Sequence, residues 1–275
     1  MEVFDLQSNQ LIHTLTDIEE PHSMLFRADA KKLYVVDGGA ALVKIYNSDT
    51  YKRIGEIKLE DDADSMAYDP ATKLMYVVNG GEGAKQEFTL LSILDTATDK
   101  KVADIKIDTD SVEAVVLEKG GSRLFVNVTG KNAVGVYDRA ARKQLALWPI
   151  ASVAKHNVAL GFDESAHRLF LSTRQPDKLV VMNSDTGAIV ASYDTTPLVD
   201  DLAFDPASKR IYLPGSGFVD VFQEKDADHY ELLAHVPGSF RAKTALLVPS
   251  LKKYFLAVPR HDKQVAEVRI FDVQP

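Results

Sequence analysis

The chain has 275 residues, of which 45% are hydrophobic and 26% are charged. A chain of this length and composition can bury a sizeable core, which excludes a disordered or collagen-like protein. Its 32 Lys and Arg residues against 40 Asp and Glu residues give a net charge of −8. This is the opposite sign to that expected of a protein that grips a phosphate backbone.

Several classes of protein and site are disfavoured by what the sequence lacks. It contains no cysteine, so disulfides, thiolate metal ligands and cysteine nucleophiles are excluded. It has no apolar run of about 18 residues, so we predict no membrane span. Residues 1–10 lack the basic and apolar regions of a signal peptide.

A repeated strand with an aromatic residue is the first pattern along the chain. Its six copies lie at residues 33–36, 75–78, 124–128, 169–172, 211–214 and 255–258, with the aromatic residues Tyr34, Tyr76, Phe125, Phe170, Tyr212 and Phe255. The copies recur at intervals of roughly 40–50 residues, which is typical of a repeat architecture.

A second strand follows each copy and ends in a polar residue. These residues are Asn47, Asp95, Asp138, Asn183, Gln223 and Asp272, and Asp5 holds the same place near the N-terminus. A polar turn and an alternating strand come next, and the following unit opens with a strand that runs into another turn. β-Branched residues, alternation and Asp-Pro turns therefore predict four short strands per unit. Four-stranded units at this period indicate a β-propeller.

These strands resemble the YVTN-repeat, or YncE-like, family of seven-bladed β-propellers. The family signature is an LYV strand, a VxVID strand and a D-x-x-T-x-K turn, found here as LYVV…VKIYNSDTYK and MYVV…LSILDTATDKK. The resemblance covers essentially the whole chain. It implies a bacterial protein that is periplasmic or secreted. Most members have no known activity, some are reported to bind DNA, and related propellers occur in haem or quinone oxidoreductases.

The expected organisation is one all-β propeller domain over residues 1–275, with six near-complete blades and a partial blade at residues 1–20. Seven strands of the VxVxD type against six of the LYV type predict a seven-bladed propeller, truncated at the N-terminus, with an incomplete first blade. The alternative is a six-bladed ring in which Gln10–Leu15 closes the last blade. That alternative leaves Glu2–Leu6 without a role.

Ionisable residues recur where the innermost strand of each unit begins. The predicted site residues are His22, Asp64, Glu113, His156, Asp200, Asp201 and Lys243. Because radial repetition brings equivalent positions together, we expect them to converge at the mouth of a central channel. Carboxylates with histidine suit a small polar ligand, a water cluster or a divalent cation. The alternative is a solvated rim with no ligand.

The expected function is a non-enzymatic binding or scaffold protein that presents the channel mouth and loops to a small polar ligand or protein partner. No catalytic motif and no cofactor motif is present. One alternative is a metal- or cofactor-associated enzyme of the lactonase or redox accessory type. A second, from the resemblance alone, is single-stranded DNA binding. The negative charge and the use of aromatic residues as strand anchors disfavour nucleic acid as a partner.

Overall fold

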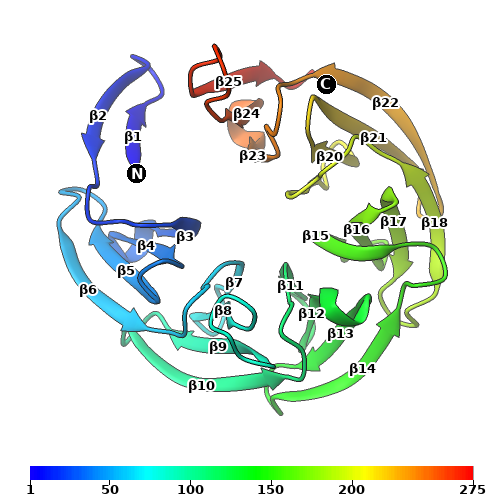
Figure 1. The fold of residues 1–275 in the computed structure, drawn as a ribbon, viewed down its shortest axis with the longest axis horizontal. Coiled ribbons are helices and arrows are strands. Elements are labelled where there is room, and N and C mark those ends of the chain that lie inside the picture. The colour runs from blue at the N-terminus through cyan, green and yellow to red at the C-terminus, as the bar shows by residue number, and fades with distance from the viewer. Residues whose placement is uncertain (275) are drawn as a thin grey trace. The chain divides into compact units, whose positions relative to one another are not determined.

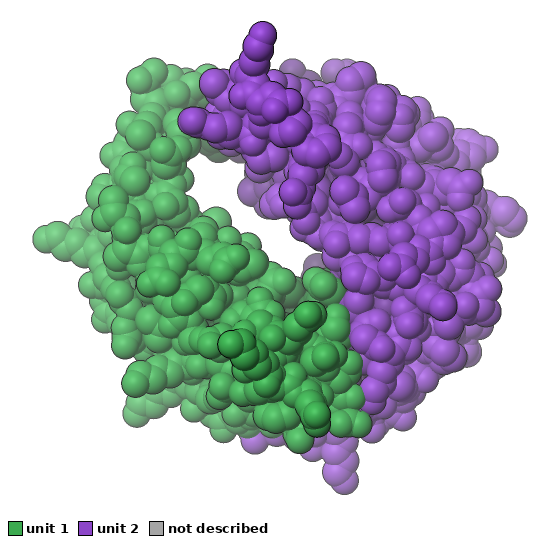
Figure 2. Space-filling view, viewed as in Figure 1, with its two compact units in different colours: residues 1–117 green, residues 118–275 purple. Residues whose placement is uncertain are grey.

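The computed structural model describes residues 1–274, and nearly all of their regular structure is β-strand (Figure 1). The chain forms two compact units, one of residues 1–117 and one from residue 118 onward (Figure 2). Within the described range the helical segments are three 3-10 turns, at Ala28–Ala30, Thr129–Lys131 and Pro249–Leu251. None of the described helices is long and apolar enough to span a membrane.

The first unit contains a hairpin and two four-stranded antiparallel sheets. The hairpin pairs β1 (Glu2–Asp5) with β2 (Gln10–Thr14). The first sheet has the order β3 (Pro21–Arg27), β4 (Lys32–Asp37), β5 (Leu42–Asn47) and β6 (Arg53–Lys58). The second has the order β7 (Met66–Asp69), β8 (Leu74–Gly80), β9 (Thr89–Asp95) and β10 (Lys100–Ile107), and β11 (Val115–Leu117) ends the unit.

The second unit continues the same pattern. It begins with the antiparallel neighbours β12 (Arg123–Val128), β13 (Ala133–Asp138) and β14 (Lys143–Pro149). Two four-stranded sheets follow, β15 (Lys155–Asp163), β16 (Arg168–Gln175), β17 (Asp177–Asn183) and β18 (Ile189–Asp194), then β19 (Ala203–Asp205), β20 (Arg210–Pro214), β21 (Phe218–Asp226) and β22 (His229–Pro237). The last sheet has three strands, β23 (Thr244–Val248), β24 (Lys253–Val258) and β25 (Glu267–Asp272).

The predicted all-β propeller of four-stranded antiparallel blades is confirmed, and the structure has six blades. This number matches the six-bladed alternative, whereas the seven-bladed prediction is not confirmed. The alternative placed Gln10–Leu15 in the last blade, but β2 pairs with β1 in the register Glu2↔Thr14. The single domain over residues 1–275 and the N-terminal truncation stay predictions.

The turn after the third strand of a blade is held by its Asn or Asp side chain. Oδ1 of Asn47 accepts hydrogen bonds from the backbone N–H groups of Asp49 and Thr50, at 3.1 and 2.9 Å, and from the Thr50 hydroxyl at 3.0 Å. Asn183 makes the same three contacts in the second unit. A short side-chain acceptor of this kind stabilises a tight turn, which explains the recurring polar residue.

The repeated aromatic residues form much of the core, as expected of apolar residues in the middle of a sheet. Tyr34, Tyr76, Phe125, Phe170 and Tyr212 are buried. Phe255 differs, since it is only partly buried while its neighbour Tyr254 is 4% exposed.

Candidate functional site

The predicted site residues lie where the first strand of each blade begins. His22 and His156 are in β3 and β15, and Asp64, Glu113, Asp200, Asp201 and Lys243 lie just before β7, β11, β19 and β23. His22, Asp64 and Glu113 belong to the first unit and the others to the second. The convergence of all seven at one mouth stays a prediction, but each unit shows which of its own members meet.

His22 and Asp64 contact each other across two neighbouring blades. Nδ1 of His22 lies 3.2 Å from Oδ1 of Asp64, and the hydroxyl of Ser23 donates to the backbone oxygen of Asp64 at 2.7 Å. The hydrogen bond to Asp64 outweighs the opposing effect of burial and, with the charges of Glu20 and Asp62, raises the pKa of His22. Two residues at equivalent positions in the alignment of strand starts are therefore in contact in the first unit.

Asp64 lines a cavity of about 170 Å³ in the first unit, called here the acidic cavity. Five carboxylate residues surround it: Asp62, Asp64, Glu82, Asp110 and Glu113. Thr89 and Ser111 add hydroxyl groups to its wall. No Lys, Arg or His residue lines it, so its surface is rich in hydrogen-bond acceptors and strongly negative.

The backbone around the acidic cavity is fixed by contacts between the loop after β8 and the loop before β11. The N–H of Glu82 donates to the backbone oxygen of Asp110 at 2.9 Å, and the Thr89 hydroxyl donates to the backbone oxygen of Thr109 at 2.9 Å. Gly81 has φ +79°, and a Cβ there would lie 2.2 Å from the oxygen of Asp110. Only glycine allows this close approach, so the two loops hold their carboxylates in a defined arrangement.

The spacing of these carboxylates bears on the predicted divalent cation. Across residues 1–274, no three His, Asp or Glu side chains are grouped so that they could hold a metal ion. A divalent cation requires several oxygen ligands at about 2.0–2.6 Å. The acidic cavity is thus better suited to a larger cationic group, bound through hydrogen bonds to separate carboxylates.

In the second unit, the predicted site residues Asp200, Asp201 and Lys243 form contacts with neighbouring protein groups. Asp200 is bound through one oxygen to Arg174 and through the other to Lys243, whose Nζ lies 2.7 Å away. Asp201 accepts the backbone N–H groups of Leu202 at 2.8 Å and Ala245 at 3.2 Å, and burial raises its pKa. Both carboxylates therefore hold together the loops that precede β19 and β23.

His156 has a different electrostatic environment from His22. Its backbone N–H donates to the side chain of Asn132 at 2.9 Å. Burial, with a further contribution from the charge of Arg174, lowers its pKa, so the imidazole is uncharged at neutral pH. His156 is consequently less readily protonated than His22.

Sequence reasoning missed Glu82 and Arg174. Both lie at the end of the second strand of a blade, after β8 and within β16. Because the first and second strands are antiparallel, the end of the second lies beside the start of the first. Inspection of the ends of the second strands, as well as the starts of the first, would have found them.

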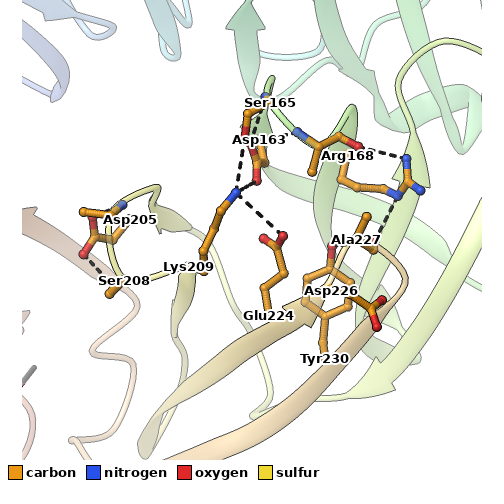
Figure 3. A network of polar contacts seen from close by, with 12 residues as sticks. Asp163, Ser165, Arg168, Asp205, Ser208, Lys209, Glu224, Asp226, Ala227 and Tyr230 are labelled. Carbon is orange, nitrogen blue, oxygen red and sulfur yellow. Dashed lines mark hydrogen bonds and ion pairs between the residues drawn. The ribbon is translucent and has the colours of Figure 1, made fainter.

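A second polar cluster in the second unit lies at the other end of β15 from His156. Figure 3 shows Lys209 between Asp163 and Glu224, with its Nζ 2.5 Å from Asp163 and 3.7 Å from Glu224. The Asp163 side chain is 2% exposed and that of Glu224 is 6% exposed. This cluster joins two neighbouring blades through ion pairs.

Comparison of the sequence with protein-family models finds no match, and comparison with curated proteins finds none either. The structure, by contrast, is similar to several solved structures. A functionally unknown protein from Desulfotomaculum acetoxidans DSM 771 has a TM-score of 0.82 at 11% identity, covering 99% of this chain and 88% of that one.

Two further solved structures have the same fold. Hydrazine synthase of Kuenenia stuttgartiensis has a TM-score of 0.78 at 16% identity, covering 98% of this chain and 88% of that one. A chain of a mitotic checkpoint complex has a TM-score of 0.76 at 14% identity, covering 93% of this chain and 77% of that one. At these identities the likeness concerns the fold alone, since one propeller fold carries many functions.

Proposed function

We propose that this chain is a non-enzymatic, YncE-like propeller that acts as a binding or scaffold protein, and that its acidic cavity binds the cationic group of a small polar ligand or protein partner. Five carboxylate residues around one small cavity carry this proposal. The protein of unknown function from Desulfotomaculum acetoxidans supports it only in that it shares the fold.

The size and chemistry of the acidic cavity favour an ammonium or guanidinium group. A volume of about 170 Å³ accommodates a few water molecules or one such group. Each N–H of the ligand would donate to a carboxylate, and charge-assisted hydrogen bonds of this kind are among the strongest in proteins. The net charge of −8 also attracts cations at long range.

The fixed loops favour binding because few groups must be ordered when a ligand docks. The contact between Gly81 and Asp110 and the bond from Glu82 to Asp110 hold the two sides of the acidic cavity together. The entropy lost on binding is then mainly that of the ligand. Binding a charged group at such a rigid site requires no catalytic residue, which fits the proposed non-enzymatic role.

The test is isothermal titration calorimetry with 1,4-diaminobutane and agmatine as probes and 1,4-butanediol as the neutral control. We expect the two cations to bind at one site and the diol not to bind. The double variant Asp64→Asn with Glu82→Gln should weaken binding about tenfold or more, because two charged acceptors are lost.

A matched control separates the acidic cavity from general charge. Asp61→Asn with Glu87→Gln removes two negative charges from the loops that carry Asp64 and Glu82, but neither residue lines the cavity. This control should retain at least half of the affinity. Equal losses in the two double variants, or no binding of either cation, would refute the proposed function.

A further inference from the structure

A second cavity, called here the basic cavity, lies in the second unit at the corresponding end of the last blade. Its volume is about 480 Å³, and it is formed where β23 begins and β24 ends. Ala257, Val258 and Pro259 provide an apolar wall. Arg241, Lys243, Arg260 and His261 line the rest, and no acidic residue does.

The basic cavity has more positive charge than its neighbours neutralise. Neither Arg241 nor Arg260 forms an ion pair with any part of residues 1–274. Lys243 is paired with Asp200, but the same carboxylate also binds Arg174. In a protein of net charge −8, two unpaired guanidinium groups beside one cavity indicate a site for an anion.

Two stacked rings form one edge of the basic cavity. The rings of Phe240 and His261 have centroids 4.1 Å apart and an interplanar angle of 26°. Phe240 is 50% exposed, and the side chain of His261 is 46% exposed. The imidazole also lies 3.4 Å from Asp262, which is itself 85% exposed. About half of each side chain is therefore accessible for stacking on a flat ligand.

The loops that carry these groups are anchored. Between Arg241 and Lys243, Ala242 is fully buried, and the backbone N–H of Arg241 donates to the Ser216 hydroxyl at 3.0 Å. The turn at His261 is closed by two backbone hydrogen bonds with Gln264, of 3.1 and 2.8 Å. The backbone positions of the cationic side chains are therefore set before any ligand arrives.

We propose that the basic cavity binds a small aromatic anion, that is, a flat ring bearing carboxylate or phosphate groups. The guanidinium groups of Arg241 and Arg260 bind the oxyanion, and Lys243 adds a third positive charge. The ring of the ligand stacks on Phe240 and His261 and packs against Pro259. This site is separate from the acidic cavity and takes a ligand of the opposite charge.

The experiment uses the full chain and calorimetric titration with four probes. Phenyl phosphate and benzene-1,3-dicarboxylate carry the ring with a phosphate or with carboxylates, so they distinguish the two oxyanions. Inorganic phosphate lacks the ring, and cyclohexanecarboxylate lacks a flat ring. We expect at least one aromatic anion to bind at one site at least tenfold more tightly than inorganic phosphate and cyclohexanecarboxylate.

Three variants assign the binding to named residues. Arg241→Gln with Arg260→Gln should lower the affinity for the aromatic anion at least tenfold. Lys100→Gln with Lys143→Gln removes two exposed charges elsewhere and should change this affinity less than twofold. Phe240→Leu keeps the charges and should remove the preference for the aromatic probe over inorganic phosphate.

Any one of three results would refute the proposal that the basic cavity binds an aromatic anion. They are the absence of binding by both aromatic anions, equal losses in the two double variants, and inorganic phosphate binding as tightly as phenyl phosphate. Because the acidic cavity is tested with amines and other variants, failure here is distinguishable from failure of the proposed function.

Discussion

At the scale of single residues, the pair of His22 and Asp64 links the acidic cavity to pH. The hydrogen bond to Asp64 raises the pKa of His22 above its ordinary value of 6.5. The pair therefore stabilises the fold fully below pH 6.5, and this contribution is lost as the pH rises through the raised pKa of the folded state.

The pH dependence can be checked by NMR titration of the His22 ring protons. We expect Asp64→Asn to lower the pKa of His22, because the charged hydrogen-bond acceptor is lost. Glu20→Gln should lower it less, since the charge of Glu20 is a smaller cause of the shift. An unchanged pKa in Asp64→Asn would contradict the contact.

The buried carboxyl of Glu224 also links stability to pH, and in the same direction as His22. Its pKa is raised, first by burial and also by the charge of Asp163, although the charge of Lys209 opposes the shift. A buried carboxyl with a raised pKa contributes to stability below its ordinary value of 4.5, and this contribution is lost as the pH rises through the raised value. One of its oxygen atoms, Oε2, has no hydrogen-bond partner in the described residues.

The substitution Glu224→Gln tests this relation, because glutamine imitates the neutral carboxyl. We expect the melting temperature of the variant, relative to the unmodified protein, to increase between pH 4 and pH 7. Glu231→Gln, at an exposed position of β22, should show no such trend. A relative decrease would mean that Glu224 is ionised and held by Lys209.

At the scale of elements, the loops between strands decide how closely blades approach. Gly81 and Gly217 both have positive φ, of +79° and +99°. They differ in their surroundings. A Cβ at Gly81 would lie 2.2 Å from the backbone oxygen of Asp110, whereas a Cβ at Gly217 would have no atom within 4 Å. Alanine at Gly217 would therefore introduce backbone strain alone, whereas alanine at Gly81 would introduce both backbone strain and a steric clash.

The matched substitutions are Gly81→Ala and Gly217→Ala. We expect Gly217→Ala to lower the free energy of unfolding by about 1 kcal/mol, the cost of a left-handed conformation for alanine. Gly81→Ala should cost about 2 kcal/mol or more, because steric overlap adds to the backbone strain, and should also weaken amine binding, because Asp110 is displaced. Urea denaturation measures the first effect and calorimetry the second. Equal losses of stability would contradict the close contact at Gly81.

At the scale of the whole molecule, the repeat made the blades predictable. Alternating strands, buried aromatic residues such as Tyr34 and turn residues such as Asn47 are local features, so each strand could be placed from its own residues. The number of blades could not, because the two strand types gave different counts, and Gln10–Thr14 could be assigned either to the partial blade at the N-terminus or to the last blade.

The candidate site was predictable only in part. Alignment of strand starts placed His22 and Asp64 at equivalent positions in neighbouring blades, which is where the structure has them in contact. It did not show that Arg174 and Lys243 neutralise Asp200, because Arg174 comes from a different strand end. Loops of unequal length after the second strands also concealed Glu82. Equivalent positions in the repeat therefore carry different charges and different contacts.

The turn formed by Asn47 has one more consequence. Asp95 and Asp138 hold the corresponding turns through the same side-chain oxygen, accepting the backbone N–H groups of Ala97 and Ala141 at 2.8 and 2.6 Å. The backbone thus requires an oxygen acceptor there but not an ionised one. Exchange of Asn and Asp at these turns would change the net charge of the protein by one elementary charge per substitution. The fold would stay the same.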